Sequence, residues 1–478
     1  MNRFLLIPLF CATLAQAGDW NQWLGPDRNS QAVDSPRLIE QLPAGGMPPI
    51  WKSDSFKSGF DGGWSSPVVA NGTAFLFSHH RSLKDGAQLP KREYPWLPDD
   101  KRGHLSAKEY EAYEVNRRDE DEALGGFYSF KETLLAIDTE TGKTKWKNEK
   151  ETVFTRFLQS ATPTVENDRL YILGAPRTLR CIDATNAKTL WETRLPGPFR
   201  DEFYMSSVAI ADGMAAVFCG TLHGVDAATG ELRWPLAGEG LKSTHTSPVV
   251  WQHKEATYVI ANADGKTHCI EPRTGNVRWS IETRASQSTP LISGNQLITY
   301  GSSRKGGLRC YTMSDTEAVE NWVNTTTADQ GSSPALFGDH VYVMGERQLS
   351  CISLASGERV WNEMLRLAKP RYTSLAIADG KIYYPWEGLL CLRAGNDSYA
   401  PLFEGKFNTD GLLATREHHW AALKLDEREE AKARAEYAKQ VEQQGPVNCT
   451  NAAIADGKIY LRMKNHLACY DLRAPSGE

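Results

Sequence analysis

A tryptophan that recurs at nearly constant spacing is the feature that most restricts how this chain can fold. Six tryptophans follow one another at intervals of 45, 43, 45, 43 and 39 residues, and they are Trp146, Trp191, Trp234, Trp279, Trp322 and Trp361. Around these tryptophans the chain reads as short apolar strands separated by turns, and several copies have an acidic residue and a glycine turn before the tryptophan. A period of about 40–50 residues with four short strands per copy is typical of β-propeller blades.

Two further copies without an internal tryptophan bring the number of repeats to eight. They run through 378–383 and 455–460, and both read Ala-Asp-Gly-Lys-Ile-Tyr. Two insertions (80–129 and 406–447) and a leader (18–47) are set aside from the repeat. One blade cannot bury both of its faces, so the copies are expected to stack into a closed ring. The sequence therefore predicts an all-β, eight-bladed propeller of four-stranded antiparallel blades over 48–478.

The ends of the repeat region predict how the ring closes. The eighth copy ends at Asp471-Leu472 and has no tryptophan, whereas Pro49-Ile50-Trp51-Lys52 has the character of a missing last strand. We therefore predict that this N-terminal segment completes the eighth blade. The alternative is that Trp51 is only a surface-packed aromatic residue.

The first 17 residues have the layout of a secretory signal peptide. Arg3 is followed by the apolar run Phe4 to Leu14 and then by Ala15-Gln16-Ala17, a small-x-small cleavage site. We expect cleavage before Gly18 and a periplasmic or secreted protein; a buried N-terminal strand is the alternative. No later apolar run reaches the 18 residues needed to cross a bilayer, so no transmembrane segment is expected.

Composition narrows the classes of partner. With 54 basic and 59 acidic side chains the net charge is −5, which excludes the broad basic surface that nucleic-acid binding requires. Hydrophobic residues make up 41% and charged residues 24%, as in ordinary soluble proteins, so the chain is not disordered. We expect a monomer.

One copy identifies the family that the repeats resemble. Ala136-Ile137-Asp138, Gly142-Lys143 and Trp146 match the docking pattern A-x-D-x-x-x-G-K-x-x-W at every fixed position, and two later copies match it in part. The chain resembles the PQQ-like (pyrroloquinoline quinone-like, quinoprotein-type) β-propeller repeat proteins over about 48–478, with a BamB-like architecture. Its opening segment, 19–26, resembles the exported versions of planctomycete-type bacteria. The resemblance implies the fold far more strongly than an activity, because one fold hosts many functions.

The repeated residues have a structural purpose. An indole is large enough to fill the wedge between blades, the glycine allows the positive φ of a tight turn, and the acidic residue accepts hydrogen bonds from turn amides. The predicted docking residues are Trp51, Asp138, Gly142, Trp146, Asp183, Trp191, Asp226, Trp234, Trp279, Trp322 and Trp361.

The cysteines follow the repeat as well. Six share one repeat position, where other copies have Ala136 or Gly224; they are Cys181, Cys269, Cys310, Cys351, Cys391 and Cys469. Equivalent positions in separate blades lie beyond the Cα separation of about 7 Å that a disulfide permits. We therefore predict six free, buried thiols that behave as small hydrophobic residues. Cys219 and Cys449 lie off this position, and a bond between them remains an alternative.

The two insertions are expected on one face of the ring. In a four-stranded antiparallel blade, the connection between the second and third strands shares its rim with the connection between blades. The insertion at 80–129 lies between the second and third strands of blade one, and the insertion at 406–447 lies between blades seven and eight. We therefore expect them to be near neighbours that cap part of the channel mouth. Ser106 and Glu109 form a capping-box pattern before a helix reaching about Ala123, and 415–443 is expected to form a charged helix. Solvated surface helices are the alternative to a lid or a docking surface.

Residues that enter the first strand of each blade should ring the same mouth. The set mixes aromatic side chains with amide, imidazole and guanidinium groups, which suits a sugar, a peptide or a flat polar ligand. A hydrated, unselective rim is the alternative. The candidate ligand-binding residues are Trp64, Arg156, Gln159, Tyr204, His245, Arg284, Gln287, Gln330, Arg371 and Tyr372.

The favoured function is a non-catalytic exported propeller that binds an envelope protein or a carbohydrate at its channel mouth. No acid/base or nucleophile constellation is visible, so no catalytic residue is nominated. No cofactor is predicted, and no metal, because the adjacent histidines at 79–80 and 418–419 are weak candidates for zinc or copper. The alternative is a quinoprotein alcohol or sugar dehydrogenase that uses PQQ with calcium. Against it, the chain has no adjacent cysteine pair, no Cys-x-x-Cys-His haem motif and no assignable Glu-Asn-Asp calcium set. Hydrolases or lyases on the same ring remain a further alternative, with no residues to nominate.

Overall fold

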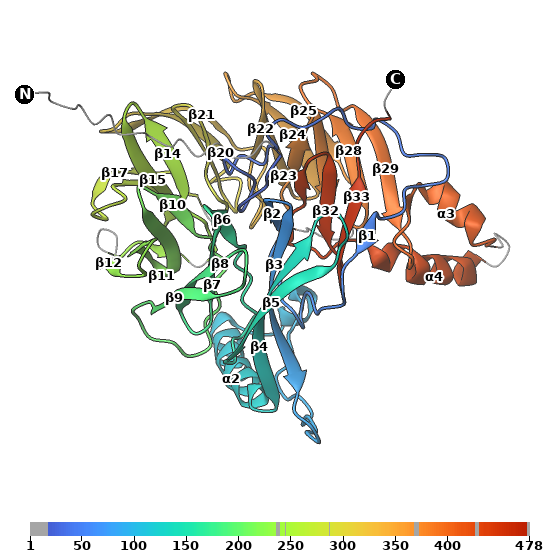
Figure 1. Cartoon of the computed structure of the whole chain (residues 1–478), viewed down its shortest axis with the longest axis horizontal. Helices are drawn as coiled ribbons and strands as arrows, with labels where there is room; N and C mark the ends of the chain where they lie inside the picture. Colours follow the sequence, from blue (N-terminus) through green and yellow to red (C-terminus); the bar gives the residue numbers. More distant parts are fainter. Residues whose placement is uncertain are drawn as a thin grey trace, which may run out of the picture.

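Eight antiparallel sheets form the body of the protein in a computed structural model that describes residues 18–235, 240–243, 245–285, 287–367, 372–425 and 430–475. Figure 1 shows these sheets fanned around a centre, with the helices outside the fan. The predicted all-β, eight-bladed architecture is confirmed.

The first four blades follow the chain in order. Blade one is β2 (Val68–Ala70), β3 (Thr73–Leu83), β4 (Tyr128–Asp138) and β5 (Thr144–Thr152). Blade two is β6 (Thr164–Glu166), β7 (Arg169–Gly174), β8 (Thr178–Asp183) and β9 (Thr189–Arg194). Blade three is β10 (Ala209–Ala211), β11 (Met214–Asp226) and β12 (Leu232–Trp234), with β13 (Lys242–Ser243) paired to β11. Blade four is β14 (Val249–His253), β15 (Ala256–Ala263), β16 (Lys266–Ile270) and β17 (Val277–Glu282).

The remaining blades repeat the pattern. Blade five is β18 (Leu291–Ser293), β19 (Gln296–Tyr300), β20 (Leu308–Met313) and β21 (Ala318–Asn324). Blade six is β22 (Ala335–Phe337), β23 (His340–Gly345), β24 (Gln348–Ser353) and β25 (Arg359–Met364). Blade seven is β26 (Ala376–Ala378), β27 (Lys381–Pro385), β28 (Leu389–Arg393) and β29 (Pro401–Phe407), extended by β30 (Leu413–Ala414). Blade eight is β31 (Ala453–Ala455), β32 (Lys458–Arg462), β33 (Leu467–Asp471) and β1 (Trp51–Lys52).

Closure of the ring occurs where the sequence predicts it. Strand β1 pairs antiparallel with β33, with Trp51 opposite Cys469 and Lys52 opposite Ala468. The start of the chain thus supplies the outer strand of the last blade (Figure 1). Strand β33 would otherwise present an unpaired edge, which a closed propeller avoids.

Neighbouring blades are joined by the predicted tryptophans. Each of seven indoles donates its Nε1–H to a backbone carbonyl of the next blade at 2.8–3.1 Å, from Trp51, Trp146, Trp191, Trp234, Trp279, Trp322 and Trp361 to Thr139, Ala184, Ala227, Pro272, Ser314, Leu354 and Asn396 respectively. In blade seven Phe403 stands opposite Cys391, as Trp361 stands opposite Cys351 in blade six. The apolar seam therefore continues there without an indole.

Glycine is required at the docking turns for two physical reasons. Gly142 has φ +69°, and a Cβ built on it would lie 2.7 Å from the Trp51 ring. A Cβ on Gly357 would lie 2.4 Å from Trp322. The turn therefore presents bare backbone to the indole face, a requirement beyond the positive φ that the sequence reasoning used.

The acidic docking residues hold the same turns. Oδ1 of Asp138 accepts from the backbone N of Thr141 at 2.9 Å and from that residue's hydroxyl at 2.8 Å. Asp183 and Asp226 accept the equivalent bonds in the next two blades. These hydrogen bonds, led by the one from the Thr141 hydroxyl, hold the pKa of Asp138 below its ordinary value.

The insertions depart from two expectations. Helix α2 (Ala107–Gly125) follows the short α1 (Asp99–Arg102) and has the predicted capping box. The single helix expected over 415–443 is wrong: the chain forms α3 (Arg416–Ala422), α4 (Glu430–Gln440) and the 3-10 turn η2 (Glu442–Gln444).

The insertions also lie apart from one another. Figure 1 shows α2 at the bottom of the view and α3 and α4 at its right. Ion pairs between the side chains of Arg118 and Asp201 and between Arg200 and Asp119 tie α2 to the connection between blades two and three. Helix α3 packs on blade seven, where a ring nitrogen of His419 lies 2.9 Å from the Lys406 carbonyl. The expectation of near neighbours fails because α2 leans away from blade eight.

None of the eight described cysteines forms a disulfide, and the six at the shared repeat position are buried. Burial raises the pKa of Cys269 and Cys351 to about 12, so these thiols stay protonated and act as packing groups. Within the described part of the chain, no helix is long and apolar enough to span a membrane. The signal peptide expected at 1–17 lies outside the described residues.

Candidate functional site

A cavity of about 330 Å³ lies at the mouth of the central channel, because every blade contributes to its lining at the entry to its first strand. The lining residues are Trp23, Trp64, Phe157, Leu158, Ser160, Phe203, Met205, His245, Gln287, Thr289, Gln330, Gly331, Tyr372 and Cys449. Only Trp23 comes from outside the blades. A concave site lined by residues from all eight blades is a favourable place for a ligand to bind.

Five of the ten residues expected at the mouth line this cavity. They are Trp64, His245, Gln287, Gln330 and Tyr372. Arg371 lies outside the described residues. Because the first strands all enter the ring at one level, the position before each strand is a workable guide to the lining.

The other four candidates lie elsewhere. Gln159 is fully buried and accepts a hydrogen bond from the Tyr204 backbone N at 2.8 Å, while the hydroxyl of Tyr204 accepts one from Arg177 at 2.6 Å. Both tie blade two to blade three. Arg156 pairs with Glu114 of α2 at 3.1 Å, and Arg284 is exposed. These residues support the rim without lining the cavity.

One wall of the cavity is a run of touching aromatic rings. Phe157 and Phe203 meet edge to face with ring centroids 5.0 Å apart, and Phe203 meets His245 edge to face at 5.4 Å. On the other side of this wall, Trp64 packs edge to face against Phe60 at 5.3 Å. Such contacts hold the rings in place and present flat apolar faces to a ligand. The sequence reasoning missed both phenylalanines, although each precedes a predicted residue by one or two positions.

Polar groups of the lining are neutral amides and hydroxyls. The Tyr372 hydroxyl donates to Oε1 of Gln330 at 3.3 Å, which orients that amide. Ser160 donates its hydroxyl to the Leu158 carbonyl at 2.9 Å. Within the described ranges, which leave out 368–371 with Lys369 and Arg371, no Asp, Glu, Lys or Arg is among the lining residues.

The far end of the channel is closed by the leader. Trp20 exchanges two backbone hydrogen bonds with Val69 of blade one, at 2.8 and 2.9 Å, and Asn21 accepts one from Val165 of blade two at 2.8 Å. In blade seven, the Ile377 backbone N donates to the Ser30 carbonyl at 2.7 Å, and the Ile377 carbonyl accepts from the Ala32 backbone N at 2.8 Å. The dark-blue leader in Figure 1 threads between the blades accordingly. No periodic signal in the sequence places it there.

The part of the leader that closes the channel is called the plug below, and Arg28 anchors it to two further blades. Its guanidinium donates to the carbonyls of Pro248, at 2.5 Å, and Val208, in blades four and three. The side chain is only 3% exposed, and burial lowers the pKa of Arg28 to about 9. A buried cation among neutral carbonyls is tolerated where several hydrogen bonds satisfy it. The plug is thus fixed by hydrogen bonds to at least five blades.

Trp23 joins the plug to the cavity. Its Nε1–H donates to the Thr289 hydroxyl of blade five at 3.0 Å, and its side chain lines the cavity. The channel is therefore a cup that opens on the face of the insertions and is closed below by the leader. No residue of α2, α3 or α4 is among the lining residues, so the described helices do not form a lid over it.

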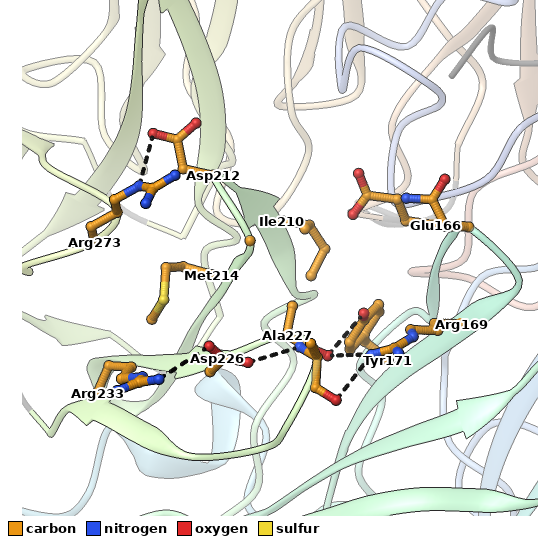
Figure 2. A pocket seen from close by; sticks show the side chains of 13 residues that line it. Glu166, Arg169, Tyr171, Ile210, Asp212, Met214, Asp226, Ala227, Arg233 and Arg273 are labelled. Carbon is orange, nitrogen blue, oxygen red and sulfur yellow. Dashed lines mark hydrogen bonds and ion pairs between the residues drawn. The ribbon is translucent and has the colours of Figure 1, made fainter. Parts of the chain in front are cut away.

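A second hollow, of about 610 Å³, lies between the turns of blades two to four on the opposite face. Figure 2 shows that its arginines are engaged: Arg233 faces Asp226 and Arg273 faces Asp212. Arg169 and Tyr171 converge on the Ala227 carbonyl, at 3.1 and 3.2 Å. Since the same carbonyl accepts the Trp191 indole, this hollow is part of the seam that joins the blades.

The histidine pairs are not brought together. His79 is buried in blade one, where its Nδ1 accepts from the Gln159 backbone N at 3.0 Å, and burial lowers its pKa to about 3. His419 lies on α3 at blade seven. Within the described residues, no group of three or more His, Cys, Asp or Glu is placed to hold a metal ion.

Fold and cavity define the class of protein: a closed eight-bladed propeller with a one-ended central cavity and docking tryptophans between its blades. A family model described as outer membrane protein assembly factor BamB matches residues 131–363. Residues 131–363 are therefore similar to this family, and the fold is that of a PQQ-like β-propeller.

A solved structure supports this fold. The quinohemoprotein alcohol dehydrogenase of Comamonas testosteroni is similar with a TM-score of 0.54 and 10% identity, covering 98% of this chain and 83% of that one. BamB from Moraxella catarrhalis gives a TM-score of 0.49 and 14% identity, covering 72% of this chain and 90% of that one. At such identities the likeness concerns the fold alone. No curated protein matches the chain.

Proposed function

We propose that this chain is an exported, non-catalytic binding protein whose cup-shaped cavity holds a ligand presented by a protein or carbohydrate partner. The observation that carries this proposal is the one-ended cavity lined by aromatic faces and neutral amides from all eight blades. Its volume of about 330 Å³ lies at the lower end of the range for small-ligand sites, about 300–1,000 Å³.

The lining supports binding rather than catalysis. The lining has one imidazole, His245, and one thiol, Cys449, which come from blades four and eight. The other lining groups are amides, hydroxyls and apolar side chains, which suit the binding and orientation of a ligand.

A quinoprotein dehydrogenase remains the alternative, but the donor set suits PQQ with calcium poorly. Calcium prefers six to eight oxygen ligands, with carboxylates among them. The described lining has no carboxylate. Asp329 lies beside Gln330, but its Oδ1 accepts from the backbone N atoms of Gly331 and Ser332 at 2.8 and 2.7 Å.

Export is part of the proposal and rests on the sequence pattern of residues 1–17. The mature protein would begin at Gly18, directly before the plug. N-terminal sequencing of protein recovered from the envelope or the medium should read Gly18-Asp19-Trp20; an intact Met1 would overturn export.

The binding function is tested with defined probes. Purified protein and the variant Trp64→Ala/Tyr372→Ala are applied to arrays of glycans and of peptides, and Trp96→Ala, which removes an exposed ring on the first insertion, is the matched control. We expect the wild type and the control to bind one class of probe and the double variant to lose it. In parallel, PQQ and calcium are added. A visible absorbance change with dye-linked oxidation of an alcohol or sugar would replace the binding function with a dehydrogenase.

A further inference from the structure

The cavity has a closed end, and this restricts the shape of its ligand. The leader crosses the channel from blade one to blade seven, and Arg28 secures it to blades three and four. A polymer cannot thread through a plugged channel. A chain-like ligand can enter only with one end, and a small ligand only as a single unit.

The chemistry of the lining restricts the class of ligand. Aromatic faces stack on the C–H face of a sugar ring, whereas amides and hydroxyls match its hydroxyl groups. Among the residues that the structure describes, no charged side chain lines the cavity. Burying an unpaired charge is costly, so a neutral ligand is favoured over a charged one.

Trp23 is the leader's own contribution to this site. Its indole is held by the 3.0 Å hydrogen bond to Thr289 and lies at the closed end. A ring already fixed in its bound position loses little conformational entropy when a ligand stacks on it. The leader therefore does two things: it closes the channel and it furnishes a pre-positioned aromatic surface.

Building on the function proposed above, we propose that the cup holds the terminal unit of a neutral carbohydrate, and that Trp23 of the leader is the stacking surface at its closed end. The volume of about 330 Å³ suits about one or two sugar rings. The leader is thus a specificity-determining element of the site, in addition to being a structural plug.

The test is titration calorimetry of the full-length mature protein against a panel of pure probes. The panel contains neutral mono- and disaccharides (glucose, galactose, mannose, xylose, N-acetylglucosamine, maltose, cellobiose), their charged counterparts glucuronic acid and glucosamine, the end-less ring α-cyclodextrin, and a set of short peptides. We expect a neutral sugar to bind, its charged counterpart to bind at least about tenfold more weakly, and the cyclic glucan not to bind.

Variants separate the role of Trp23 from the integrity of the fold. Trp23→Ala should weaken sugar binding at least about tenfold, and Trp23→Phe should retain it to within a few-fold, because a ring remains. Trp96→Ala is the control that should leave binding unchanged, and thermal melting of each variant checks folding. Wild-type affinity in a folded Trp23→Ala variant would overturn the role of the leader.

The outcomes also distinguish this inference from the function on which it rests. If peptides bind and no neutral sugar does, the carbohydrate assignment is overturned while the binding function stands. Equal binding of the cyclic and linear glucans would overturn end recognition. If neither sugars nor peptides bind, both proposals fail together.

Discussion

Replacing Trp51 by alanine should weaken the ring at its closing seam. Trp51 is 7% exposed, its indole donates to the Thr139 carbonyl at 2.8 Å, and its face covers Gly142. Truncating a buried tryptophan to alanine costs about 3–5 kcal/mol in lost contacts and cavity. Strand β1 has two paired residues, and the backbone N atoms of Ile50, Ser53 and Phe56 also donate to carbonyls of blade eight, so this side chain is one of several anchors of the closure.

Urea unfolding followed by far-UV circular dichroism measures the loss, and amide hydrogen exchange locates it. We expect the unfolding free energy of Trp51→Ala to fall by about 3–5 kcal/mol, with faster exchange in β33, which becomes an edge strand. Trp51→Phe should lose only about 1–2 kcal/mol, because it keeps most of the packing and gives up one hydrogen bond.

Trp361→Ala is the matched control. Its indole makes the same kind of bond, to the Asn396 carbonyl at 3.0 Å, but the chain continues on both sides of that seam. Exchange should then rise between blades six and seven and stay slow in β33. A loss below about 1 kcal/mol for Trp51→Ala, with unchanged exchange in β33, would refute closure by this tryptophan.

Three further predictions concern a buried ion pair, a half-buried carboxyl group and the thiols. Glu132 and Arg180 form a buried ion pair at 2.9 Å. Glu132→Ala should lower the free energy of unfolding by about 3–5 kcal/mol because it leaves a buried cation, whereas Glu132→Leu/Arg180→Met should lower it much less. A double-mutant cycle in urea measures the difference. Burial raises the pKa of Asp19 to about 6, with the charge of Asp456 adding to the effect. The folded state therefore holds this proton longer than the unfolded state, and stability should fall as pH rises from about 4 to 6; Asp19→Asn should flatten that part of the profile of Tm against pH, and an unchanged slope would contradict the assignment. Thiol titration at pH 8 should find no more than two reactive cysteines in native protein and all eight after denaturation without reductant; fewer than six in the denatured protein would contradict free thiols.

The fold was predictable from the sequence because each repeat contains the residues that form its own strands, turns and seam. Strands, turn glycines and docking tryptophans recur in one order, so the number of blades follows from counting them. The closure also followed, since the last copy lacks an outer strand and the segment around Trp51 supplies one. The cavity was half predictable: Trp64 and Tyr372 line it, whereas Gln159 and Tyr204 turn inward to hold two blades together.

Two features could not be predicted from the sequence, because the contacts that form them do not recur from one repeat to the next. Helix α2 was recognisable from Ser106 and Glu109, yet its lean toward blades two and three depends on ion pairs such as Arg118 with Asp201, 83 residues apart in the chain. The charged stretch 415–443 has helical composition throughout, but the chain breaks into α3 and α4, so that Trp420 packs against Tyr437 with ring centroids 5.4 Å apart.

The sequence by itself determined an eight-bladed ring, its seams and its point of closure, because those depend on neighbours that repeat every 40 or so residues. Only the tertiary structure decided that the ring is a cup. The leader crosses the channel through single contacts, such as Arg28 with Pro248 and Trp23 with Thr289, that join residues more than 200 positions apart. Such contacts depend on the shape of the finished ring, and no local pattern encodes them.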